Sequence, residues 1–415
     1  MAATRRIFLK NSALTMVGIG ALPHWLARSA WASTLGARKK ILVAIFQRGA
    51  ADGLNIVIPY GEQAYYATRP SIAIARGATL DLDGFFAFHP ALAPLLPLWK
   101  QGALACVHAA GSPDPTRSHF DAQDYMESGT PGRKATDDGW LNRALGLDQW
   151  ANHSPLRAVA MGPQVPLTLQ GPVPAVAINN LSAFRGAPGP VGADFQAMYD
   201  TTSNALLRPA GQDTFAALRL MQHLDPKTYQ PAPGADYPAG GLGASLRQLA
   251  QIIKADVGVE VAFADVGGWD HHVAEGSTQG RLANSLHGFA QAIAAFWADL
   301  GSRQQDVVLV TMSEFGRTVR ENGNRGTDHG HANVMFALGG DVRGGKVYGD
   351  WPGLKPEQLY QNRDLAVTTD FRDVLSEAVM RHLGVADLGG VFPGFQANPA
   401  RFRNFLRRSP SPAGA

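Results

Sequence analysis

Short runs of wholly apolar residues alternate with amphipathic helical segments along most of this 415-residue chain. The runs are rich in β-branched residues and have no polar face, as in residues 40–46, KILVAIF. Strands of this kind are buried on both faces, so they belong to a parallel sheet that helices cover on both sides. The sequence therefore predicts an α/β fold of three layers, α/β/α, around a mainly parallel central sheet.

Individual elements can be placed from the same pattern. Strands are expected at residues 40–46, 103–108, 259–266, 307–311 and 334–338. Where apolar side chains recur at helical spacing, helices are expected at residues 90–99, 243–255, 281–300 and 370–383. Residues 225–243 are rich in proline, glycine and alanine. They predict a surface loop within one large domain that spans residues 33–400.

The first 32 residues have the pattern of a twin-arginine export signal. Arg5 and Arg6 precede Phe-Leu-Lys, an apolar run too short to span a bilayer, and an Ala-Trp-Ala cleavage site that ends at residue 32. We expect the twin-arginine translocase to export the folded chain, so the mature protein should be periplasmic or secreted. An ordinary secretory signal is the alternative.

The charge balance changes once this segment is removed. It holds 4 of the 37 basic residues and no acid, which leaves 33 basic against 34 acidic residues, a net charge of −1. A mildly acidic body does not favour nucleic-acid binding. No later apolar run reaches the roughly 18 residues of a membrane span, and the one cysteine, Cys106, excludes an internal disulfide. Residues 401–415 are expected to form a basic, disordered tail.

Side chains of the types that bind metals follow several of the predicted strands. Because ligands bind beyond the carboxyl ends of strands in open α/β sheets, these side chains should gather at one edge. The candidate metal ligands are Asp52, Asp270, His271, His272, Glu314, Asp328, His329 and His331. Carboxylate oxygens and imidazole nitrogens suit Zn²⁺, Mn²⁺ or Mg²⁺. Taken singly, each residue could equally be a cap or turn residue.

The run from residue 114 to residue 120 offers a nucleophile. Ser118 becomes reactive where a metal or base lowers the pKa of its hydroxyl, and Arg117 beside it could hold an oxyanion. Thr116 is the rival hydroxyl, and Ser118 is also a good N-cap for a helix. His119 and Asp121 could instead begin a histidine and carboxylate iron site. Such sites usually belong to β-sandwich barrels, which this pattern does not resemble.

The order of these residues resembles the alkaline phosphatase, sulfatase and nucleotide pyrophosphatase superfamily. Residues 115–118, Pro-Thr-Arg-Ser, are similar to the nucleophile turn of its phosphodiesterase branch, which implies that Ser118 attacks. The resemblance further implies that Asp52 and Asp270 are metal acids. Residues 328–330 resemble the Asp-His-Gly metal motif, although Glu314 stands where the superfamily places that pair.

More narrowly, residues 40–385 resemble an exported family catalogued as domain of unknown function 1501. The resemblance is carried by residues 48–55, 116–124, 313–318 and 326–333. The superfamily resemblance implies an exported metal-dependent hydrolase of phosphate or sulfate esters with two, one or no bound metals. A non-catalytic periplasmic binding or assembly protein on the same fold is the alternative. A small anionic ester or a glycan is the ligand class expected in either case.

Overall fold

The computed structural model describes residues 40–148, 154–181 and 228–407, together with the single positions 201, 217 and 220. The predicted export signal and the end of the predicted tail, residues 408–415, lie outside the described residues.

Within the described residues, a nine-stranded sheet has the order β11-β5-β10-β9-β1-β8-β6-β7, with β12 paired to β5. The strands are β1 Ile41–Gln47, β5 Leu104–Gly111, β6 Ala158–Met161, β7 Val176–Ala177, β8 Val261–Val266, β9 Val307–Met312, β10 Asn333–Gly339, β11 Val347–Tyr348 and β12 Thr369–Asp370. The run from β9 to β7 is parallel throughout. β10 is antiparallel to both of its neighbours, so β5 points in the same direction as β9.

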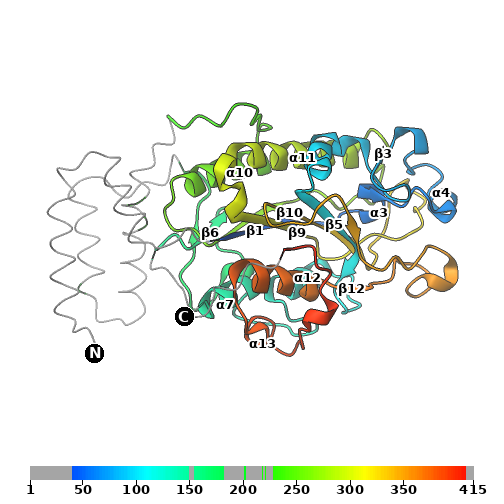
Figure 1. Cartoon of the computed structure of the whole chain (residues 1–415). Helices are drawn as coiled ribbons and strands as arrows, with labels where there is room; N and C mark the ends of the chain where they lie inside the picture. Colours follow the sequence, from blue (N-terminus) through cyan, green and yellow to red (C-terminus); the bar gives the residue numbers. More distant parts are fainter. Residues whose placement is uncertain are drawn as a thin grey trace. The chain divides into compact units, whose positions relative to one another are not determined.

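Helices cover both faces of this sheet (Figure 1). α10 (Gly241–Lys254) and α11 (Arg281–Leu300) lie over one face, and α7 (Trp140–Gly146), α12 (Phe371–Ala378) and α13 (Leu388–Val391) lie over the other. All seven residues of β1 are buried, and alternate residues pack into the two different apolar clusters. The predicted three-layer α/β/α fold with a mainly parallel sheet is therefore confirmed.

Shorter elements complete the described chain. A small antiparallel sheet has the order β2-β4-β3, made of Val57–Ile58, Ala87–Phe88 and Leu80–Asp81. The remaining α-helices are α3 Gly53–Ile56, α4 Gln63–Thr68, α5 Leu96–Lys100 and α6 His119–Ser128. Short helices of other types are η1 Arg76–Ala78, η2 Pro90–Leu95, η3 Leu167–Leu169, η4 Gly301–Asp306, η5 Pro356–Gln358, η6 Val379–Leu383 and η7 Pro399–Arg401. None of the helices in the described residues combines the length and hydrophobicity that a membrane crossing needs.

The C-terminal boundary differs from the expectation. Residues 401–407, assigned to a disordered tail, pack against the domain because Phe402, Phe405 and Leu406 are buried in the cluster beneath the sheet. Arg401 forms an ion pair with Asp373 of α12 at 3.0 Å. Only the apolar residues between the arginines distinguish this segment from a free tail.

The strand directions fix where polar loops meet. β5, β9, β1, β8 and β6 share one direction, so their carboxyl ends lie at one edge of the sheet. Because β10 is antiparallel, it starts at that same edge. The loop of residues 313–332, between β9 and β10, therefore begins and ends there, beside the loops that follow β1, β5 and β8.

Candidate metal centre

Asp270 lies where the loop after β8 contacts the loop after β1. A Cβ atom on Gly49, whose φ is +118°, would lie 2.8 Å from the backbone nitrogen of Asp270. Trp269 is fully buried and anchors the β8 loop by donating from Nε1 to the Val266 carbonyl at 3.0 Å. Glycine is therefore required at position 49, and the loop geometry holds the Asp270 carboxylate at the sheet edge.

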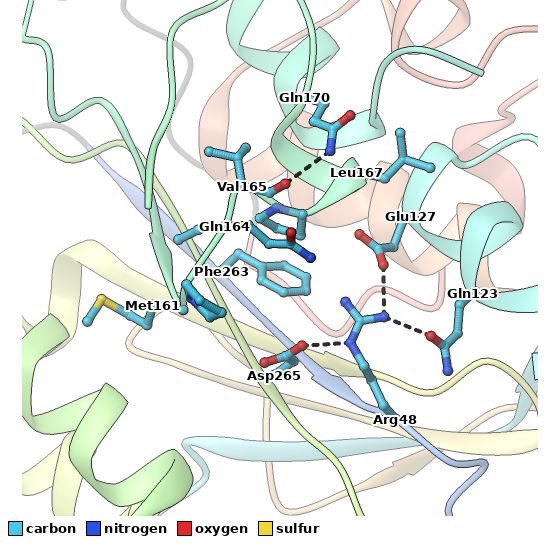
Figure 2. A pocket seen from close by; sticks show the side chains of 14 residues that line it. Arg48, Gln123, Glu127, Met161, Gln164, Val165, Leu167, Gln170, Phe263 and Asp265 are labelled. Carbon is cyan, nitrogen blue, oxygen red and sulfur yellow. Dashed lines mark hydrogen bonds and ion pairs between the residues drawn. The ribbon is translucent and has the colours of Figure 1, made fainter. Parts of the chain in front are cut away.

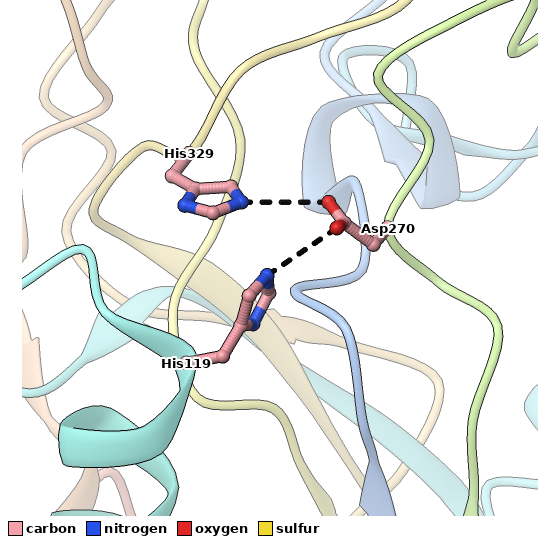
Figure 3. A group of neighbouring side chains, drawn as sticks. All are labelled: His119, Asp270 and His329. Carbon is pink, nitrogen blue, oxygen red and sulfur yellow. Dashed lines mark ion pairs between the residues drawn. The ribbon is translucent and has the colours of Figure 1, made fainter.

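Three histidines from three separate segments of the chain surround this carboxylate. The Nε2 atoms of His119 and His329 lie 3.5 and 3.4 Å from the carboxylate oxygens of Asp270 (Figure 3). The Nε2 atom of His272 lies 3.0 Å from Asp270 Oδ1 and 2.9 Å from His329 Nε2. We call His119, Asp270, His272 and His329 the donor cluster. Its side chains are 23–42% exposed, so ions and small molecules can reach them.

The second ring nitrogen of each histidine is held by an acceptor. His119 Nδ1 lies 2.7 Å from Glu314 Oε1, and His329 Nδ1 lies 2.8 Å from the Arg117 carbonyl oxygen. His272 Nδ1 lies 3.2 Å from Asp328 Oδ1. A neutral ring that donates from Nδ1 to its partner turns the Nε2 lone pair toward Asp270. Metal-binding histidines are oriented in this way.

The convergence of these lone pairs fits a cation. Two unprotonated Nε2 atoms at 2.9 Å repel each other unless a proton or a metal ion lies between them. Among the described residues, His119 Nε2 is buried and has no hydrogen-bond partner. The donor atoms of His119, Asp270 and His329 all lie within 4.8 Å of one another, close enough to share one ion. The residues present therefore fit a divalent metal.

A buried arginine sets the charge of Asp270. Arg317 Nη1 donates to Asp270 Oδ1 at 2.7 Å, and Arg317 Nε donates to Thr327 Oγ1 at 3.1 Å. Partial burial would raise the pKa of Asp270, but the hydrogen bond and charge of Arg317 hold that pKa below its usual value. The carboxylate is therefore ionised at neutral pH, as a metal ligand must be.

Glu314 supports the cluster from behind. Its Oε1 atom accepts hydrogen bonds from the Gly49 backbone nitrogen at 2.8 Å and from Gln123 Nε2 at 2.9 Å, besides the bond from His119. Burial would raise the pKa of Glu314, but the hydrogen bonds, led by that of His119, hold it below its usual value. The same hydrogen bond raises the pKa of His119. Glu314 thus orients a histidine and does not itself face the other donors.

Asp52 lies in a different, buried arrangement. The guanidinium of Arg69 contacts both of its carboxylate oxygens, with Nη2 at 3.0 Å from Oδ1, and neither side chain is exposed. Glu275 forms a hydrogen bond with Asp52, and burial together with the charge of Asp52 raises the pKa of Glu275 well above its usual value. We call Asp52 and Glu275 the buried acid pair. Arg69 occupies the oxygens with which Asp52 was expected to bind a metal.

The two other candidate histidines point elsewhere. His331 is buried and stacks on Tyr360, with ring centroids 4.3 Å apart, and burial lowers its pKa. His271 is also buried, and burial lowers its pKa to about 4. Their neighbours in sequence, His272 and His329, are the histidines that join the donor cluster.

Ser118, the predicted nucleophile, and Arg117, its predicted partner, make contacts in different places. Ser118 caps α6, where its Oγ accepts from the Asp121 backbone nitrogen at 3.4 Å. Arg117 instead directs its guanidinium to the buried Asp364, with Nη2 2.5 Å from Oδ2. Only the Arg117 carbonyl reaches the donor cluster. Ser118 precedes His119 of the donor cluster in the chain, whereas the Arg117 side chain is paired with Asp364.

The sequence pattern offered His119 only as part of an alternative iron site, and it did not indicate Arg317 and Gln123 as supports. His119 directly follows the candidate nucleophile, and that adjacency was the available signal. Arg317 and Gln123 carry no such signal, because an arginine after a strand and a glutamine in a helix are common in any protein.

The chain is similar to one protein family and to several solved structures. The family described as "Protein of unknown function (DUF1501)" matches residues 100–392. No curated protein matches the chain. The C-terminal periplasmic domain of EcEptC from Escherichia coli, in complex with Zn, is similar at 10% identity and a TM-score of 0.35, over 74% of each chain. The PsFucS1 sulfatase from Pseudoalteromonas sp. is similar at 11% identity and a TM-score of 0.38, over 87% of this chain and 71% of that one. The lipoteichoic acid synthase LtaP from Listeria monocytogenes is similar at 9% identity and a TM-score of 0.33, over 73% and 66%.

Proposed function

This chain belongs to the DUF1501 family, as its sequence resemblance indicated, and we propose that it is a metal-dependent hydrolase of phosphate or sulfate esters. The observation that carries the proposal is the donor cluster, in which three Nδ1-anchored imidazoles turn Nε2 toward one ionised carboxylate. Imidazole-rich sets of this kind favour Zn²⁺ over Mg²⁺. A zinc ion bound there would act as a Lewis acid and lower the pKa of a bound hydroxyl.

Ser118 is the nucleophile in this proposal. Its Oγ would form a bond to the phosphorus or sulfur atom and release the alcohol, after which water would release the acid. The serine is the N-cap of α6, a helix of ten residues, and the free N–H groups of a helix N-terminus favour the anionic group that is being transferred. Arg117 has no part in the reaction, because its guanidinium is paired with Asp364.

Turnover of 4-nitrophenyl phosphate and 4-nitrophenyl sulfate by zinc-loaded protein tests the proposal. We expect Ser118→Ala to lower kcat by at least about 100-fold while zinc content is kept. Thr116→Ala is the matched control, since Thr116 Oγ1 only accepts from the Ser118 backbone nitrogen at 3.2 Å. A larger loss of kcat in Thr116→Ala than in Ser118→Ala would mean that Thr116 is the nucleophile. A zinc-loaded wild type that hydrolyses neither ester would instead favour a binding or assembly protein.

We also propose that the twin-arginine route exports the chain and that the mature protein begins at Ser33. Changing both Arg5 and Arg6 to Lys should leave the full-length precursor in the cytoplasm, which immunoblots of cell fractions would detect. Export of that double variant at the normal rate would contradict the proposal.

A further inference from the structure

A cavity of about 370 Å³ opens beside the donor cluster, beyond the ends of β1, β8 and β6. Arg48 follows β1, Asp265 lies near the end of β8, and Met161 ends β6. Because these strands are parallel, the cavity lies at the sheet edge that also carries the donor cluster. Its volume falls within the range of roughly 300–1,000 Å³ that is usual for small-molecule sites.

One side chain joins the cavity to the candidate metal centre. Gln123 lines the cavity, where its Oε1 accepts from Arg48 Nη1 at 3.1 Å. Its Nε2 donates to Glu314 Oε1, the same oxygen that holds His119. Two hydrogen bonds, from Gln123 to Glu314 and from His119 to Glu314, therefore connect the wall of the cavity to the donor cluster at the same edge of the sheet.

The cavity contains a cation whose charge is already offset. Figure 2 shows the guanidinium of Arg48 between Asp265 on one side and Glu127 and Gln123 on the other. Arg48 Nε lies 2.6 Å from Asp265 Oδ2, and Nη1 lies 2.8 Å from Glu127 Oε1. One arginine against two carboxylates gives this part of the lining a formal charge of −1. A second anionic group would be repelled here.

The rest of the lining combines hydrogen-bonding groups with apolar surface. The Gln164 and Gln170 side chains supply amides, and Phe263 and Met161 supply an apolar wall. Carboxylates accept from hydroxyl groups, while amides and guanidinium nitrogens donate to them, so a molecule rich in hydroxyls can use both sets at once. Its C–H surface can then pack on Phe263.

We propose that this cavity binds the uncharged, hydroxyl-rich carbohydrate part of the substrate while the ester group lies at the donor cluster. The inference rests on the proposed function for the role of the ester, but carbohydrate binding can be measured without turnover. The substrate is then a phosphorylated or sulfated saccharide.

Gly162 can carry a larger side chain at the edge of the cavity without disturbing the cavity walls. A Cβ atom built on Gly162 meets no atom within 4 Å, and Gly162 lines the cavity. The variant Gly162→Phe therefore places a large side chain into open space. Gly288→Phe is the matched control, because Gly288 on α11 also has nothing within 4 Å of its Cβ position and does not line the cavity.

Saturation-transfer NMR on chelator-treated protein, with D-glucose, D-galactose, D-mannose and ethanolamine as separate probes, tests the inference. We expect at least one sugar to bind the wild type and Gly288→Phe, and its affinity for Gly162→Phe to fall at least tenfold. In separate samples loaded with zinc, the zinc content of all three proteins should be equal. Equal sugar binding by Gly162→Phe, or binding of ethanolamine but of no sugar, would overturn the inference.

The two proposals fail separately. Zinc-dependent ester turnover by a protein that binds none of the three sugars would overturn the carbohydrate site and leave the hydrolase intact. Sugar binding that Gly162→Phe removes, in a protein without turnover, would support the carbohydrate site and count against the hydrolase.

Discussion

Asp52 and Asp270 are both carboxylates at the same sheet edge, after the neighbouring strands β1 and β8, yet their surroundings differ. Arg69 contacts both oxygens of Asp52, and both side chains are buried. Arg317 takes one oxygen of Asp270, and three imidazoles approach the same carboxylate. An acid at this edge becomes a candidate metal ligand when its arginine leaves room for other donors.

The largest expected effect comes from removing the arginine of the buried acid pair. Arg69→Met leaves Asp52 without its cation in the interior, so we expect the free energy of unfolding to fall by about 3–5 kcal/mol. Urea denaturation measures the change. Arg76→Met is the control, because Arg76 is exposed and donates only to the Tyr60 carbonyl. A zinc affinity that fell with Arg69 in the folded protein would mean that the two acids share one site.

Removing a donor should instead lower metal affinity. We expect His329→Ala to weaken zinc binding by more than about 100-fold, since even changes behind the ligands cost roughly 10–100-fold. Competition with a chelating dye measures this affinity. His331→Ala is the matched control in the same loop, because His331 stacks on Tyr360. A greater loss of zinc affinity in His331→Ala would mean that His331, and not His329, is the ligand.

Glu314 tests whether the support behind the donors contributes. Glu314→Gln keeps the shape of the side chain but removes the charge that orients His119. Zinc affinity should fall by about 10–100-fold, with little change in thermal unfolding of the metal-free protein. If the affinity did not change, the hydrogen bond would serve packing alone.

The smallest effect concerns the pH dependence of the buried acid pair. The pKa of Glu275 is raised in the folded protein, so folding retains a proton that the unfolded chain releases above about pH 4.5. The stability associated with Glu275 is therefore present below that pH and is lost as pH rises toward the folded pKa.

Glu275→Gln resembles the protonated acid and should remove this part of the loss. Denaturation at pH 5 and pH 8 should show a smaller drop for the variant than for the wild type. A steeper drop in the variant would mean that Glu275 is ionised in the folded protein.

The sequence predicted the fold better than it predicted the site. The long strands are wholly apolar runs and α11 has clear helical periodicity, and the structure places these elements within a few residues of expectation. β6 has only four residues, so its apolar run is too short to indicate a strand. The apolar residues at 402–406 were outweighed by the basic residues around them.

The site depended on partners that are distant in sequence. Strand-end position predicted Asp52 and Asp270 equally well, and the difference arises from Arg69 and Arg317, neither of which the pattern connects to them. His271 and His272 are adjacent, and only the local backbone decides which ring turns toward Asp270. Residue type and spacing predicted that the edge is polar, but they could not separate ligands from ion-paired or buried neighbours.

The donors of the cluster come from chain segments far apart in sequence. His272 and His329 are 57 residues apart, and His119 is joined to a glutamate 195 residues away. A metal ion there would act as a cross-link that closes two long loops. Closing these loops in an unfolded chain costs conformational entropy, whereas in the folded chain they are already closed. The metal would thus bind tightly only to chains in which β5, β8 and β9 are already in place. In a sample saturated with zinc, the metal content would then report the fraction of molecules that are correctly folded.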